Sequence, residues 1–152
     1  MRTLAWIAFV ALPVLAHAGT DTVAVVGIQD GRPLVFTREA EERIAELARE
    51  LLLTAHYEAS PPIDIEQRWK EARRASHLHV SFTPARTVIL RFSTTGPTAE
   101  HGVQVDEMLI PISKDRWPDY ILVREQGKVR AFSKYDPRQA QALQDVLGAE
   151  GR

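Results

Sequence analysis

The chain has 152 residues, 45% of them hydrophobic and 26% charged, and its 19 basic and 20 acidic residues give a formal net charge of −1. The basic residues are interspersed with acidic ones and form no stripe of the kind that nucleic-acid binding requires, so we expect no nucleic-acid partner. The chain contains no cysteine, which excludes disulfides, thiol catalysis and a lipid anchor on cysteine.

The first eighteen residues have the three-part pattern of a secretory signal peptide. Arg2 supplies a positive charge, the apolar run Leu4–Leu15 follows, and small residues stand on both sides of His17. As a helix the apolar run would be about 18 Å long, too short for a hydrocarbon core of about 30 Å. We therefore predict cleavage after Ala18. The alternatives are an uncleaved anchor and a buried N-terminal helix.

The rest of the chain, residues 19–152, is predicted to form one domain in the periplasm or outside the cell. It contains no second apolar stretch of about 18 residues, so we expect no membrane insertion after cleavage of the signal. It also lacks a linker long enough to divide it and shows no internal repeat.

A β-hairpin is predicted at the start of this domain. The runs Val23–Ile28 and Arg32–Phe36 flank the dipeptide Asp30-Gly31. Both residues of that dipeptide tolerate the positive φ that a tight hairpin turn requires. Pro33 cannot donate a hydrogen bond to a neighbouring strand, which places the second strand at a sheet edge.

Three amphipathic helices are predicted, over residues 38–54, 65–75 and 137–147. In each, apolar residues recur every three or four positions and form one stripe. A residue that commonly caps helices stands before each of them. These caps are Thr37, Asp64 and Asp136.

Five short strands are predicted between the second and third helices. They are His77–Phe82, Thr87–Phe92, Val103–Ile112, Tyr120–Val123 and Lys128–Phe132. A turn is expected at Thr83–Ala85, a long loop at 93–102 and a tight hairpin at Gln126-Gly127. Strands and helices do not alternate, so we predict an α+β fold: a largely antiparallel sheet, with a five-strand C-terminal meander and the N-terminal hairpin, and amphipathic helices packed on one face.

His77 and His79 are the candidate metal ligands. Residues two apart on a strand point to the same side, here away from the inward-facing Leu78, so the two imidazoles could share an ion. Zinc would need at least one further ligand. The alternative, which we favour, is a pair of solvated surface histidines, because an alternating strand produces this spacing by default.

The loop before the fourth of these strands is the candidate binding segment. Arg116, Trp117 and Tyr120 are of the residue types enriched at protein interfaces. The alternative is that Trp117 closes over the core. The adjacent carboxylates Asp106 and Glu107 should face opposite sides of their strand, and we expect one of them to cap a backbone group or to pair with an arginine.

No catalytic motif is present. No serine lies in a G-x-S-x-G or S-x-x-K context, and phosphate-binding glycine loops are missing from the sequence. We therefore expect no cofactor and favour a non-enzymatic binding or interaction domain whose partner is an envelope protein or another component of the cell envelope. The alternative is a metal-binding protein or metal-dependent hydrolase that uses His77 and His79.

Overall fold

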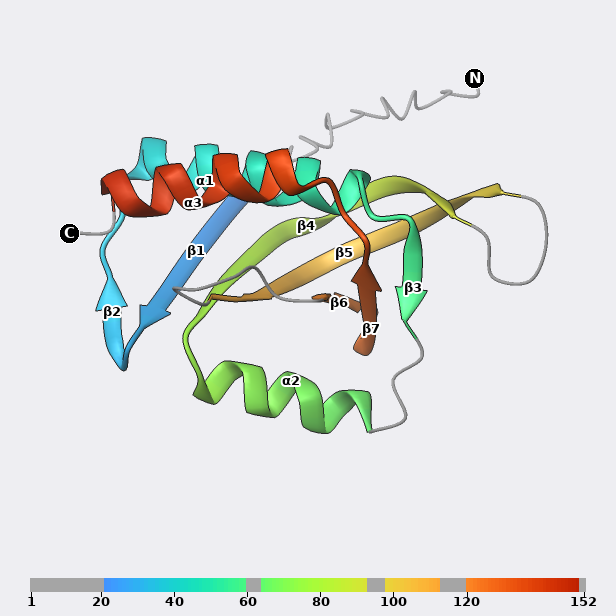
Figure 1. Ribbon diagram of the computed structural model, residues 1–152, viewed down its shortest axis with the longest axis horizontal. Coiled ribbons are helices and arrows are strands. Elements are labelled where there is room, and N and C mark those ends of the chain that lie inside the picture. The colour runs from blue at the N-terminus through green and yellow to red at the C-terminus, as the bar shows by residue number, and fades with distance from the viewer. Residues whose placement is uncertain (1–20, 60–63, 93–97, 113–119, 151–152) are drawn as a thin grey trace, which may run out of the picture.

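The computed structural model of the chain describes residues 21–59, 64–92, 98–112 and 120–150. These residues form seven strands and three helices (Figure 1). In chain order they are β1 (Thr22–Gln29), β2 (Arg32–Leu34), α1 (Arg38–Leu53), β3 (Tyr57–Ala59), α2 (Ile65–Arg74), β4 (His77–Phe92), β5 (Ala99–Pro111), β6 (Ile121–Glu125), β7 (Lys128–Ser133) and α3 (Pro137–Glu150). The signal peptide and its cleavage site lie outside the described residues and stay predictions.

All seven strands belong to one sheet, in the order β2-β1-β4-β5-β6-β7-β3, and every neighbouring pair is antiparallel. This confirms the predicted α+β class. Both predicted tight turns are present, with φ of 52° and 74° at Asp30 and Gly31 and of 49° and 81° at Gln126 and Gly127. The sequence analysis missed β3, the three-residue strand at the far edge of the sheet.

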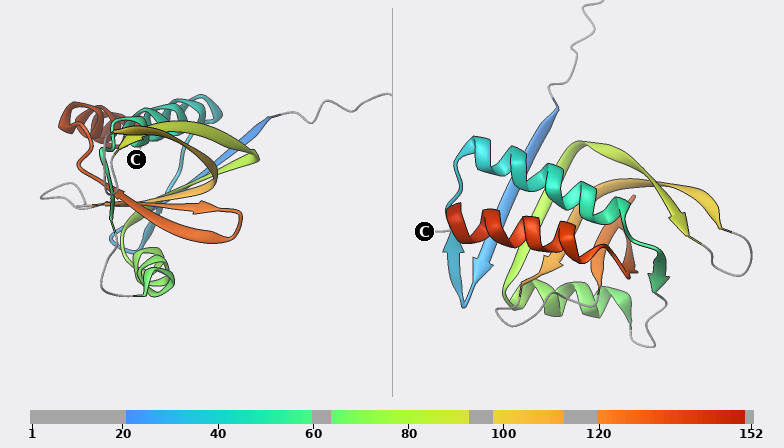
Figure 2. Two further views of the ribbon diagram at one scale, coloured as in Figure 1. Left: turned by 90° about the vertical axis from the view of Figure 1, so that its right-hand side faces the viewer. Right: turned by 45° about the horizontal axis from the view of Figure 1, so that its top comes forward.

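The predicted turn at Thr83–Ala85 is wrong. β4 runs through it as one long strand, and only its register against β5 shifts, between Ser81 and Arg86. Pro84 lies in this stretch and lacks a ladder donor, so it disturbs the pairing without ending the strand. The C-terminal meander therefore has four strands, not five, and β4 and β5 form a long curved arm (Figure 2).

α1 and α3 lie side by side on one face of the sheet, which we call the inner face (Figure 2). Their apolar stripes meet the inward side chains of the strands in the main core. Leu78, Val80 and Phe82 all belong to this core, as predicted, and the first two are fully buried. The predicted helix caps also form: Thr37 accepts the Ala40 N–H at 3.2 Å, and Asp64 accepts the Glu66 N–H at 3.0 Å.

α2 lies on the opposite face of the sheet, which we call the outer face, so the prediction that all helices share one face is wrong (Figure 1). The reason lies in β5 and β6, which carry three consecutive buried apolar residues each, 108–110 and 121–123. Successive strand residues point to opposite faces, so such runs require cover on both sides. α2 supplies the outer cover with Trp69 and Ala72.

Candidate functional site

The strand register aligns outward-pointing residues into rows across the sheet. One row begins at Val26 on β1 and continues through His79, Leu109 and Leu122 to Ala131 on β7. Its last three members lie in the apolar cluster beneath α2. The row therefore leads from an uncovered strand to a covered one.

α2 covers the outer face over β5, β6 and β7, and its Trp69 reaches His79 on β4. The outward residues of β1 stay open: Ala24 is exposed, Val26 is 53% exposed and Ile28 is partly exposed. The outward face of a half-covered antiparallel sheet normally carries polar side chains. β1 carries an apolar stripe there instead, consisting of Ala24, Val26 and Ile28, which we call the β1 stripe.

His79 stands at the boundary between the β1 stripe and α2. A hydrogen bond of 2.7 Å joins its Nε2 to Oε2 of Glu107, and its side chain is 16% exposed. The Trp69 ring meets the imidazole edge to face, with ring centroids 6.0 Å apart and planes at 88°. His79 thus points outward as predicted, but it is largely buried and is held by Glu107 and Trp69, so it is not the solvated surface histidine that we favoured.

Arg124 continues this polar boundary on β6. Its guanidinium carbon lies 4.4 Å from the centroid of the Trp69 ring, a cation–π geometry. It also lies near two carboxylates, 3.7 Å from Glu107 and 3.6 Å from Glu66 on α2. Both distances exceed hydrogen-bond length. Among the residues that the structure describes, the buried Nε of Arg124 and Nε1 of Trp69 have no hydrogen-bond partner. Together, His79, Glu107, Arg124, Glu66 and Trp69 form what we call the boundary cluster.

The boundary cluster can offer hydrogen bonds and charge to a ligand laid over the outer face. It holds one guanidinium, two carboxylates and an imidazole, so charges of both signs are present within one patch. Acid–base catalysis would further require a nucleophile or bound substrate within hydrogen-bond reach of the His79 ring. Within the described residues, the one polar side chain hydrogen-bonded to that ring is Glu107.

His77 lies on the same outer face, one row away from His79, but it is buried, with 4% of its surface exposed. Its Nδ1 is 2.8 Å from the carbonyl oxygen of Ala75. Across the described part of the chain, no three His, Asp or Glu side chains are grouped so that they could share a metal ion. The shared metal site of His77 and His79 stays a prediction, which elemental analysis would test.

The predicted binding loop can be placed only in part. Arg116 and Trp117 lie outside the described residues. Tyr120, the residue immediately before β6, is partly buried and packs against the apolar cluster under α2. The interface role of these three residues stays a prediction.

The adjacent carboxylates behave as the sequence predicted. Asp106 Oδ2 accepts the Gln126 N–H at 2.6 Å, whereas Glu107 meets His79 and Arg124. The two carboxylates therefore have separate partners and do not act as an acid–base pair.

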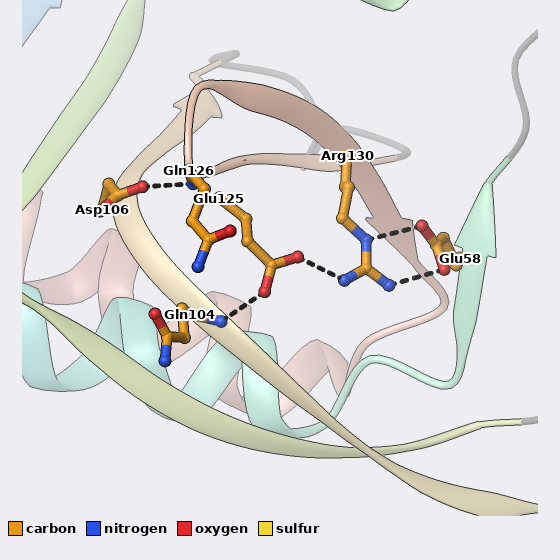
Figure 3. Close-up of polar contacts among 6 residues, drawn as sticks. All are labelled: Glu58, Gln104, Asp106, Glu125, Gln126 and Arg130. Carbon is orange, nitrogen blue, oxygen red and sulfur yellow. Dashed lines mark hydrogen bonds and ion pairs between the residues drawn. The ribbon is translucent and has the colours of Figure 1, made fainter.

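A second polar cluster, which the sequence analysis missed, joins the strands at the β3 edge (Figure 3). Arg130 on β7 donates two hydrogen bonds to Glu58 on β3, at 2.7 and 2.8 Å, and one of 2.8 Å to Glu125 on β6. Glu125 also accepts the backbone N–H of Gln104 on β5 at 2.7 Å. Hydrogen bonding to Glu58 raises the pKa of Arg130; burial opposes this, and Glu125 adds to the increase.

This second cluster is structural. β5 and β6 pair over only three residues, Glu107 to Leu109, and then separate. Glu125 and Asp106 each bridge the separated strands by accepting a backbone N–H, and Arg130 fastens the short strand β3 to the sheet. All its charged groups have partners, which leaves none directed at a ligand.

Three surface hollows of about 520, 680 and 570 Å³ lie against α1 or α3. None of these three is lined by the boundary cluster or by the β1 stripe. Ala24 and Val26 are exposed on the outward side of β1, and such a surface suits a macromolecule better than an enclosed small molecule.

Within the described residues, no helix combines the length and apolar character needed to cross a membrane. Comparison of the chain with models of protein families, with curated proteins and with solved structures finds no match in any of the three.

Proposed function

We propose that this protein is an exported, non-enzymatic binding domain that engages a protein of the cell envelope through the outer face of β1 and the adjoining boundary cluster. One observation carries the proposal: the outer face is covered by α2 on one half only, and the uncovered half presents the apolar β1 stripe. Contiguous exposed apolar surface marks sites of association more often than solitary exposed residues do.

The composition of this surface fits a protein interface. Such interfaces have an apolar centre surrounded by polar groups and are enriched in arginine and aromatic residues. The β1 stripe supplies the apolar centre. The boundary cluster, next to it on β4 to β6, supplies an imidazole, carboxylates and the Arg124 guanidinium at its rim.

The structure offers an internal comparison for Val26. Ile89 also points outward, from the arm formed by β4 and β5, and is 48% exposed against 53% for Val26. Its neighbours on the same face are the polar Thr87 and Arg91, so Ile89 is an isolated apolar residue. It serves as a matched control for the β1 stripe.

The experiment places a photo-crosslinking amino acid at Val26 or at Ile89 in the cells that make the protein. We expect a discrete adduct with one envelope protein from position 26 and none from position 89. Val26→Asp should reduce capture of that partner at least tenfold, whereas Ile89→Asp should leave it unchanged. The same adducts from both positions, or a Val26→Asp variant that retains its partner, would refute the proposed surface.

The proposed location rests on the first eighteen residues and needs its own test. We expect the exported protein to begin at Gly19, which the mass of the intact purified protein decides. Recovery from the cytosol with Met1 still attached would contradict export.

A further inference from the structure

β1 has a free edge along most of its length. β4 pairs with one side of it along Thr22–Ile28, but β2 pairs with the other side only along Gly27–Gln29. Within the described residues, the stretch Thr22–Val26 therefore has a strand on one side only. Figure 2 shows β2 beside just one end of β1. Backbone N–H and C=O groups on such an edge are available to another strand.

This edge lacks the protection that the other edges of the same sheet carry. Charged side chains, proline and short length normally keep exposed edges from pairing. β2 and β3 are three residues each, with Arg32 and Pro33 in the first and the ion-paired Glu58 in the second. Beyond Thr83, β4 also has no neighbouring strand on this side among the described residues, and it carries Pro84, Arg86 and Arg91. The sequence of β1, TVAVVGIQ, has neither charge nor proline.

The two most exposed large apolar side chains of the described residues flank this free edge. Val35 is 72% exposed and Val26 is 53% exposed. Val35 directly follows Leu34, whose partner on β1 is Gly27. Both valines thus lie where β2 stops covering β1.

We propose that two copies of this chain pair antiparallel through the free edges of β1. A two-fold axis at Ala24 sets Ala24 opposite the same residue of the second copy, Thr22 opposite Val26, and Val23 opposite Val25. Every pair is then apolar or threonine with valine, and each partner relation is reciprocal, as an isologous contact requires. The proposal goes beyond the binding function proposed above and does not depend on it.

The charges around the edge favour a second copy. No charged residue lies within β1, so two copies bring no like charges together along the strands. The nearest acidic residue, Asp21, is paired with Arg86 at 3.3 Å. The hollow beside Thr22 and Val23 is lined by charges of both signs, so the surface next to the edge has no excess of one charge that would repel a second copy. The charged residues of this hollow are Asp21, Arg38, Glu41, Glu42 and Arg86.

Self-pairing also accounts for the apolar outward residues of β1. Joining the two edges places the β1 stripes of both copies side by side on one continuous outer face. Cross-strand apolar contacts between the copies then add to the backbone hydrogen bonds. An edge that met water would gain nothing from alanine and valine at these positions.

The oligomeric state of the purified protein, measured by analytical ultracentrifugation, provides the first test. We expect a dimer. Ala24→Lys sets two ammonium groups opposite each other at the axis and should raise the dissociation constant at least tenfold, with an unchanged circular dichroism spectrum. Ile89→Lys, which adds the same charge on the exposed arm of β4, should remain dimeric.

The absence of cysteine allows a second test that reads out the register directly. Opposed Cα atoms of antiparallel strands are about 4.5–5.5 Å apart, within the range a disulfide spans. Ala24→Cys should form a crosslinked dimer on mild oxidation, whereas Ile89→Cys should not. A protein that is monomeric at all concentrations, or a dimer that Ala24→Lys leaves intact and Ala24→Cys fails to crosslink, would overturn the proposal. The partner adduct at Val26 tests the proposed function separately, because it requires a different protein and not a second copy.

Discussion

Replacing Arg130 by methionine tests whether the second polar cluster holds the β3 edge to the sheet. Methionine keeps much of the aliphatic length of arginine but removes all three hydrogen bonds to Glu58 and Glu125. The side chains of the three residues are 24%, 25% and 22% exposed, so each is about three-quarters buried. The variant therefore leaves two largely buried carboxylates without their cation.

Removal of one partner from a fully buried ion pair costs about 3–5 kcal/mol. Here a quarter of each side chain still meets water, and Glu125 keeps its hydrogen bond from the Gln104 N–H. We therefore expect Arg130→Met to lower the free energy of unfolding by about 2–3 kcal/mol. For a domain of this size that corresponds to a fall in Tm of about 8–12 °C. Hydrogen bonding to Glu58 raises the pKa of Arg130, so the contribution of its guanidinium is not lost as the pH rises from neutral to moderately alkaline values.

Urea denaturation of wild type and variant at pH 7 measures the difference. Arg49→Met is the matched control, because Arg49 pairs with Glu46 three residues earlier on the surface of α1. Exposed pairs of this kind contribute less than about 1 kcal/mol. If Arg130→Met destabilises the protein no more than Arg49→Met does, the buried cluster does not fasten the edge and the reasoning fails.

Three further expectations follow from single contacts. Gly27→Ala would place a Cβ 2.9 Å from Cδ1 of Leu34 on β2 and should lower the free energy of unfolding, measured by chemical denaturation, by about 1–3 kcal/mol. Gly102→Ala is the control: its Cβ would lie 3.7 Å from its nearest neighbour, so the loss should be clearly smaller. Trp69→Ala should cost about 3–5 kcal/mol, because Trp69 is 2% exposed. Trp69→Phe should cost much less, since the indole Nε1 has no hydrogen-bond partner within the described part of the chain; equal losses would contradict this. The hydrogen bond from Arg49 lowers the pKa of Glu46 from 4.5. The small difference in unfolding free energy between wild type and Glu46→Gln should therefore be present at pH 7 and disappear as the pH falls well below 4.5. A difference that persists in acid would refute this expectation.

Local chemistry was sufficient to predict the two tight hairpin turns and the helix starts. Asp30-Gly31 forms a tight turn because both residues accept positive φ, and Thr37 and Asp64 cap their helices because a side-chain oxygen can accept a free N–H there. These interactions span two or three residues. They depend little on the rest of the fold, and the sequence therefore reveals them.

The boundary cluster shows where such reasoning ends. The outward direction of His79 follows from strand alternation, but its partners do not. Glu107 is 28 residues away and Arg124 is 45 positions along the chain, and the hydrogen bond depends on how β4, β5 and β6 align. Trp69 packs against the side chains of His79 and Arg124. It comes from α2, a helix that was expected on the other face of the sheet.

One available signal was overlooked. The runs Met108–Ile110 and Ile121–Val123 are apolar at consecutive positions, which is typical of strands covered on both faces. These runs predict a helix on the outer face, and the apolar stripe of α2 is the one that packs there, against Leu109 and Leu122.

The sequence by itself determined the helices with their caps and the two tight turns, because each depends on neighbours within a few residues. The order of these elements along the chain then indicated the antiparallel α+β class. The tertiary structure alone decided which face α2 covers, which edge of β1 stays open and which charges meet at Arg124 and Arg130. Those features arise from contacts between segments tens of residues apart. Their energies depend on strand order and register, which local patterns leave undetermined.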